Sequence, residues 1–183
     1  MSKTYLITKR DGRKEELDLD KLHKVVFHAC DGITGVSPSE VEIKSHIQFY
    51  NGITSSDIQE TLIKSAADLI SEETPNYQYV AGRLINYHLR KHVYGEFLPP
   101  SLFDIIKLNI NKGFYDKEIL ELYTVEEINE LDAYIKHDRD NLLTYAAMEQ
   151  FRGKYLVQNR ATKQIFETPQ VAYIMIAATL FGR

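Results

Sequence analysis

The spacing of hydrophobic residues changes within the first twenty positions from a strand-like to a helix-like period. Residues 5–8 read as a short strand, Asp11-Gly12 as the turn of a tight hairpin, and residues 14–17 as the return strand. Asp18 can then cap a helix that begins near Leu19, because apolar side chains recur behind it every three or four positions. The pattern predicts one β-hairpin followed by a helix with one buried face.

Three further helices are predicted in the first half of the chain. The second has Ser37 at its cap and Pro38 at its first position, and residues 51–52 stop it. The third opens at the capping sequence of residues 54–57, and the fourth runs over residues 75–94. The residues expected to face inward are Val41, Ile43, Ile47 and Tyr50 on the second helix and Ile58, Leu62, Ala66 and Leu69 on the third.

Paired prolines at positions 99 and 100 mark the predicted boundary between two domains, residues 1–95 and 96–183. The second domain reads as mostly helical, so the predicted fold class is mainly α. Its last helix is apolar on most sides, and we therefore expect it to be buried in something larger, with the chain stopping partway into this domain. Helices are predicted over residues 101–111, 117–122, 124–137, 138–151 and 169–181, and short strands over residues 155–157 and 164–166.

Composition narrows the classes of partner. Hydrophobic residues make up 44% and charged residues 26% of the chain, as in an ordinary soluble domain. The formal net charge of -4 argues against a nucleic-acid partner. We also expect no membrane partner and a cytoplasmic location, because no apolar run spans a bilayer and no signal peptide opens the chain. The one cysteine, Cys30, is expected in the core and excludes an internal disulfide.

Basic side chains gather at the hairpin tip and on the fourth predicted helix. Residues 9–14 carry four basic groups around a glycine, which would serve a triphosphate, although a solvated tip is the plainer alternative. His88 and Lys91 share a helix face and could meet phosphate, or residues 90–92 could simply complement the helix dipole. The N–H groups of residues 55–57 offer an anion site of the kind found at nearly every helix start. With no catalytic or metal-ligand motif present, spacing alone predicts an α-rich domain that could bind an anion.

The order of four segments carries a more specific resemblance. The chain resembles the N-terminal part of class Ia ribonucleotide reductase large subunits over nearly its whole length. Its first part is similar to the ATP-cone, a β-hairpin plus four-helix module, and the rest to the helical region that leads into a ten-stranded α/β barrel absent from this sequence. The segments that carry the resemblance are LITKRDGRKEELDLDKLHKV, SHIQFYNGITSSDIQETLIKSAADLI, TPNYQYVAGRLINYHLRKHVYGEF and HDRDNLLTYAAMEQFRGKYLVQNR.

The resemblance implies a nucleotide site. Lys9 and Lys91 are expected to contact phosphate, and His88 is similar to a histidine on the phosphate side. Ser55 stands where the family commonly has threonine and retains the hydroxyl. The residues expected to line the base and sugar are Glu15, Glu16, Leu17, Asp18, Leu19, Asp20 and Lys21.

The resemblance also implies what the site does. ATP is expected to activate and dATP to inhibit, with Mg²⁺ accompanying the nucleotide and no redox cofactor in this chain. Asp57 and His88 are the residues expected to couple the bound nucleotide to the cone surface. At Gln59 the chain departs from relatives that carry a second histidine there.

The implied partners are the remainder of the large subunit, further large subunits and the radical-bearing small subunit. The family's chemistry needs several cysteines, so with Cys30 alone this chain is expected to be inactive as a reductase and to form one part of that oxidoreductase. The alternatives are a stand-alone ATP-cone repressor, an anaerobic glycyl-radical reductase, and a structural helical module without a ligand. A repressor would be expected to carry a zinc ribbon, for which this sequence has no cysteine pair.

Overall fold

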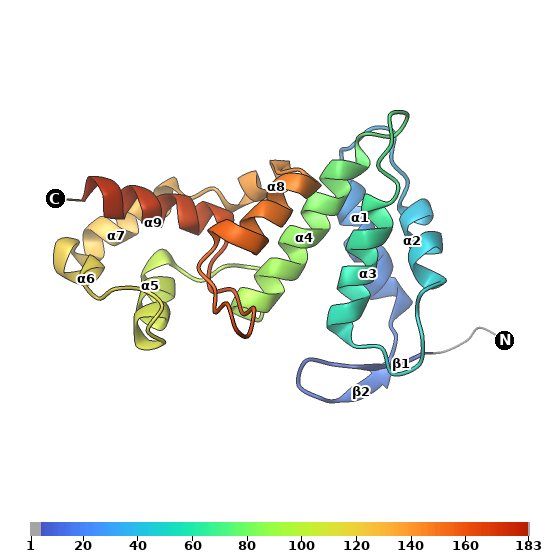
Figure 1. The fold of residues 1–183 in the computed structure, drawn as a ribbon, viewed down its shortest axis with the longest axis horizontal. Coiled ribbons are helices and arrows are strands. Elements are labelled where there is room, and N and C mark those ends of the chain that lie inside the picture. Colours follow the sequence, from blue (N-terminus) through green and yellow to red (C-terminus); the bar gives the residue numbers. More distant parts are fainter. Residues whose placement is uncertain (1–4, 183) are drawn as a thin grey trace. The chain divides into compact units, whose positions relative to one another are not determined.

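The computed structural model describes residues 5–182, and its contacts divide the chain into two compact units (Figure 1). The first unit comprises residues up to 88 together with 141–148, and the second comprises residues 89–140 and those from 149 onward. Both are built mainly of helices, which confirms the predicted fold class. The prediction about a signal peptide rests partly on residues 1–4, which lie outside the described residues.

The first unit begins with the predicted hairpin. Strand β1 (Leu6–Thr8) pairs antiparallel with β2 (Lys14–Glu16), and both strands are a residue shorter than predicted. The connection is closed by two backbone hydrogen bonds, from Lys9 N to Arg13 O at 2.8 Å and from Gly12 N to Lys9 O at 2.9 Å. Gly12 has φ +83°, a conformation that favours glycine, so the turn residue identified in the sequence is required by the backbone.

The four predicted helices of the first unit are present, and their caps follow from local sequence. Helix α1 (Leu19–Cys30) is capped by Asp18, whose carboxylate accepts a hydrogen bond from Lys21 N at 3.1 Å. Helices α2 (Pro38–His46) and α3 (Ser55–Ala67) pack beside it in order, and α4 (Tyr77–Tyr94) follows (Figure 1). Apolar side chains from all four helices form the core, among them Val26, Cys30, Val41, Leu62, Ala66 and Leu84.

The predicted inner face of α2 is largely wrong. Val41 is fully buried, but Ile43 is 67% exposed and Ile47 is 82% exposed. The helix also ends at His46 and does not reach residue 51. Val41 and the buried Ser45 are four positions apart and therefore share the inner face, whereas Ile43 lies two positions from each and points away from it.

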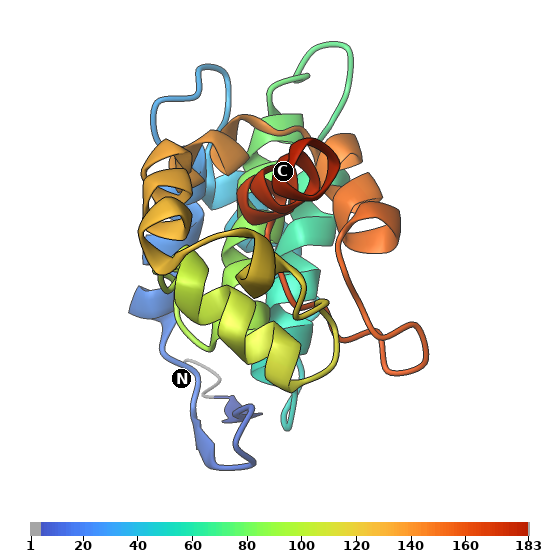
Figure 2. The same ribbon diagram turned by 90° about the vertical axis from the view of Figure 1, so that its left-hand side faces the viewer.

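The second unit is held by a separate apolar core. Its helices are α5 (Leu102–Asn111), α6 (Ile119–Leu122), α7 (Val125–Tyr134) and α9 (Pro169–Phe181). Figure 2 looks nearly along α9, with α5 and α7 beside it. The buried residues that join these helices are Leu102, Ile105, Ile106, Ile119, Ile128, Ile135, Val171 and Ala178.

Two predictions for the second half are wrong. Residues 138–151 do not form one helix: a 3-10 helix (His137–Leu142) precedes α8 (Tyr145–Gln150), and a π-helical turn (Phe151–Tyr155) follows it. The Thr144 hydroxyl accepts a hydrogen bond from Ala147 N at 3.3 Å, and this capping starts a new helix. The strands predicted at residues 155–157 and 164–166 are reduced to one isolated bridge, because the Glu167 carboxylate accepts the Val157 N–H.

No helix within residues 5–182 is long and apolar enough to cross a membrane. Helix α9 matches its predicted bounds, yet the structure buries only part of its apolar surface. Ile176 is 53% exposed, Leu180 is 70% exposed and Phe181 is 84% exposed.

Candidate functional site

The hairpin is attached to the segment that leads into α3. Thr8 N donates to Ile53 O at 3.0 Å, and Gly52 N donates to Leu6 O at 2.7 Å. Thr8 and Thr54 form a parallel bridge. Because Lys9 directly follows Thr8, these bonds bring the base of the basic hairpin tip to the first turn of α3.

Lys9 at the hairpin tip is held by an ion pair. Its ammonium group lies 2.9 Å from the Glu15 carboxylate across the hairpin, and both side chains are about one third exposed. The hydrogen bond from Lys9 lowers the pKa of the Glu15 carboxyl. An anion that binds Lys9 must therefore share or displace Glu15. At the exposed end of the tip, Arg13 Nε lies 2.7 Å from the Asp11 carboxylate.

Residues 15–21 lead from β2 into α1. Asp18 is held twice by Lys21, through the capping bond from its N–H and through its ammonium group at 3.3 Å, and these contacts lower the pKa of Asp18. The half-buried members of this run are Glu15, Leu17 and Asp18, and the exposed members are Glu16, Leu19, Asp20 and Lys21.

The start of α3 is organised by Thr54. Its hydroxyl accepts a hydrogen bond from Asp57 N at 3.0 Å and donates one to the Asp57 carboxylate at 2.7 Å. Ser55, the first residue of the helix, is half-buried. Asp57 therefore belongs to the capping arrangement, which gives it a structural role whether or not it also couples a nucleotide to the surface.

We expect Thr54→Ala to lower the free energy of unfolding by about 1 kcal/mol, because Asp57 N would lose its capping acceptor. Urea denaturation followed by circular dichroism would measure this loss. The matched control is Thr61→Ala, since the Thr61 hydroxyl only donates back to Asp57 O at 2.7 Å within the same helix. Equal losses in the two variants would contradict the capping role.

The remaining predicted residues lie on α4. His88 is 9% exposed, and its Nε2 lies 3.4 Å from the Glu60 carboxylate of α3. Lys91 follows His88 by three positions on the same side of the helix and is half-buried. The Gln59 side-chain oxygen is buried without a hydrogen-bond partner. Sequence reasoning did not identify Glu60, because its position beside His88 depends on how α3 packs against α4.

Arg10 and Tyr87 are two further residues that sequence reasoning left out of the site. Burial lowers the pKa of the Arg10 guanidinium, and the neighbouring Tyr87 phenol raises it. Burial also raises the pKa of Tyr87. Arg10 directly follows Lys9 in the chain and Tyr87 directly precedes His88, and both of these neighbours were predicted from the sequence. The hairpin, the start of α3 and the middle of α4 are therefore mutually connected within the first unit.

Of the residues 90–92 that could complement the dipole of the fourth helix, Lys91 and His92 lie in the last turn of α4, whereas Arg90 has a different role. Arg90 is only 2% exposed and donates a hydrogen bond to His137 O, so it serves the packing of the second unit. Asp140 is fully buried near it. Among residues 5–182, no group of three or more His, Cys, Asp or Glu side chains is placed to hold a metal ion.

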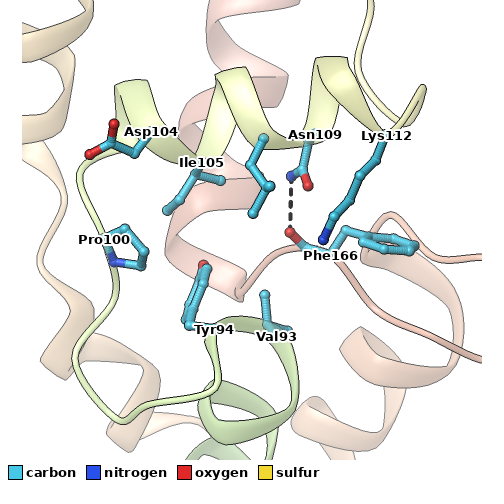
Figure 3. A pocket seen from close by; sticks show the side chains of 9 residues that line it. Val93, Tyr94, Pro100, Asp104, Ile105, Asn109, Lys112 and Phe166 are labelled. Atoms are coloured by element: carbon cyan, nitrogen blue, oxygen red, sulfur yellow. Dashed lines mark hydrogen bonds between the residues drawn. The ribbon is translucent and has the colours of Figure 1, made fainter.

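A small cavity in the second unit offers no competing nucleotide site. It measures about 80 Å³, whereas sites for drug-sized ligands have about 300 Å³ or more. In Figure 3, Tyr94 reaches it from α4 and Ile105 from α5, while Asn109 donates to Phe166 O at 3.0 Å on one side. Mostly apolar side chains line it, so it lacks the convergent charges that a phosphate group requires.

Comparisons with known proteins identify the family to which the chain is similar. A family model described as the ATP cone domain matches residues 5–92. The ribonucleoside-diphosphate reductase 1 subunit alpha of Escherichia coli (strain K12) is 53% identical over 182 residues, which is 100% of this chain and 24% of that protein. The corresponding subunit alpha of Haemophilus influenzae is 50% identical over 183 residues, and that of Enterobacteria phage T4 is 44% identical over 176 residues and 95% of this chain. The chain spans about a quarter of the length of these relatives.

Proposed function

This chain belongs to the family of ribonucleoside-diphosphate reductase alpha subunits, as their N-terminal region with the ATP cone. From this premise we propose that the cone, residues 5–92, binds ATP and dATP as allosteric effectors. ATP activates and dATP inhibits reduction of ribonucleotides by the complete enzyme. The main support is the connected arrangement of the hairpin, the start of α3 and α4, because it joins the elements that carry Lys9, Ser55 and His88.

The charges in this arrangement suit a triphosphate. Lys9 on the hairpin and Lys91 on α4 would supply ammonium groups, and His88 would add a further donor. The run of residues 15–21 would lie along the base and sugar, with Glu15 released from Lys9 when phosphate binds. Mg²⁺ would arrive with the nucleotide, because this ion is usually held by phosphates and only one or two carboxylates.

ATP and dATP differ by one hydroxyl, so opposite effects require contacts that sense the 2′ position. A ligand shifts a conformational equilibrium only by its differential affinity for the two states. Asp57 and His88 are our candidates for carrying that difference to the surface of the cone. Both are held by neighbours, Asp57 by Thr54 and His88 beside Glu60, so a ligand that displaces either contact changes the packing of α3.

The remaining parts of the proposal concern the complete enzyme. The chain has one cysteine, Cys30, which is buried in the first unit with its pKa raised to about 11 by burial, so it is poorly suited to thiol chemistry. Catalysis would therefore reside in the rest of the alpha subunit. Further partners would be other alpha subunits and the radical-bearing beta subunit, in the cytoplasm.

Titration calorimetry of the chain with dATP and then ATP, in the presence of Mg²⁺, tests the proposal. We expect saturable binding by the native chain and binding at least ~100-fold weaker by Lys9→Ala/Lys91→Ala, because each lost charge-assisted bond to phosphate costs ~1.5–3 kcal/mol.

Lys24→Ala/Lys64→Ala is the matched control, since it removes the same charge from exposed positions on α1 and α3. Binding should stay within about threefold of the native value, the range expected from long-range electrostatics alone. If the folded native chain did not bind either nucleotide, or if both double variants weakened binding equally, the proposed site would be wrong.

A further inference from the structure

We propose that residues 141–148 form a structural part of the cone and that Arg83 couples the nucleotide site to them. The proposal rests on the proposed function, and it extends the cone beyond residues 5–92, where the family model ends. In sequence this segment lies almost fifty residues beyond the fourth helix of the cone, yet it clusters with the first unit.

Arg83 joins three pieces of the first unit. Its Nη1 donates to Asp31 O at 2.6 Å and to Ala29 O at 3.3 Å, at the C-terminal end of α1. Its Nε donates to Asn141 O at 3.3 Å. A guanidinium presents several donors in a rigid plane, so one side chain on α4 ties the end of α1 to the segment 141–148.

Two neighbours of Arg83 strengthen this attachment. Asn86 donates from its side chain to the Asn141 side-chain oxygen at 2.7 Å. At Gly82 the backbone of α4 approaches so closely that a Cβ atom would lie 2.2 Å from Leu143 O. The segment is therefore held by a part-buried side-chain hydrogen bond and by direct backbone packing.

The attachment and the proposed nucleotide contacts use different sides of α4. Arg83 and Asn86 are three positions apart and share one face, whereas His88 and Lys91 share a face on the other side of the helix. A displacement of α4 at the nucleotide therefore moves the opposite face against residues 141–144.

A movement at the nucleotide site can also reach Arg83 through helix α1. Its N-terminal end carries Asp18 and Lys21, which belong to the proposed base and sugar contacts, and its C-terminal end carries the carbonyl groups that Arg83 binds. A helix of 12 residues is about 18 Å long and behaves as a rigid rod. A change of its tilt at the nucleotide must therefore alter the geometry at Arg83, which passes it to Asn141.

Hydrogen exchange of the 183-residue chain, measured by mass spectrometry with and without saturating dATP and Mg²⁺, tests the coupling. We expect dATP to slow exchange in peptides that cover residues 141–148 by about fivefold or more. The Arg83→Lys variant keeps the charge but loses the planar set of donors, so it should bind dATP and show little of this protection. Arg139→Lys, at an exposed position just before the segment, is the matched control and should behave as the native chain does.

The possible failures are distinguishable. Native protein that binds dATP without any change in residues 141–148 would overturn the coupling and leave the nucleotide site standing. Full protection in Arg83→Lys would overturn the role of Arg83, and loss of protection in Arg139→Lys would show that the effect is not specific to it. Absence of dATP binding by the native chain would overturn both the coupling and the proposed function.

Discussion

Replacing Gly82 with alanine is expected to lower the free energy of unfolding by about 3 kcal/mol, the upper part of the range for overpacked cores. The added methyl group would lie 2.2 Å from Leu143 O and 3.1 Å from the Thr144 carbonyl carbon. Both are backbone atoms, so a change of side-chain rotamer cannot relieve the clash. Either α4 bends or residues 143–144 separate from it, and each response breaks contacts around Arg83.

Urea denaturation at neutral pH would measure this loss. Gly153→Ala is the matched control, because nothing lies within 4 Å of a Cβ at that position and its φ is not in the left-handed region. Since alanine restricts the unfolded chain more than glycine does, the control should be neutral or more stable by up to ~1 kcal/mol. Similar stability in the two variants would show that α4 and Leu143 are not in close contact in solution.

The Asp140→Asn variant should remove a large part of the pH dependence of stability. Burial raises the pKa of Asp140 to about 7 in the folded protein, whereas an unfolded aspartate titrates near pH ~4. Between these values the folded state binds the proton more tightly, so this carboxyl stabilises the fold at low pH and that contribution is lost as the pH rises through about 7. From pH 5 to pH 8, the free energy of unfolding of the native chain should fall by roughly 2 kcal/mol relative to that of Asp140→Asn.

Unfolding curves at both pH values for the native chain and the variant would give this difference. Asp138→Asn, an exposed carboxylate two residues earlier, is the matched control for the loss of one acidic group. A difference between native and Asp140→Asn chains that stayed constant from pH 5 to pH 8 would contradict a buried, protonated Asp140. The polar and charged groups that interact with Asp140 are Arg90 and Tyr94 on α4 and Gln170 in the first turn of α9.

Local signals in the sequence were sufficient where one turn of chain determines the structure. Asp18 and Thr54 each cap the helix that the sequence predicted behind them, and the hairpin turn at Gly12 has the expected backbone. The break within residues 138–151 could not be predicted in the same way. It accompanies the burial of Asp140 near Arg90, a partner fifty positions earlier in the chain, which no local pattern reveals.

In the candidate site too, some features follow from local sequence and others depend on how distant segments pack. The residues of the hairpin tip and of α4 were predicted, because their charge and helical spacing are visible in the sequence. Their partners were not: Glu60 meets His88, and Arg10 lies near Tyr87, only through the packing of separate elements. The exposed Ile43 was misplaced because an apolar residue on a helix does not reveal which face is covered.

The attachment of residues 141–148 bears on how this cone could move between proteins in evolution. A transferred gene segment that ended at residue 92 would encode Arg83 and Asn86. It would not encode Asn141, to which both of these side chains donate hydrogen bonds. Gly82 would be transferred without the backbone of residues 143–144 that packs closely against it. A recipient protein would have to provide a substitute for that backbone, so in this lineage recombination should favour breakpoints beyond residue 148.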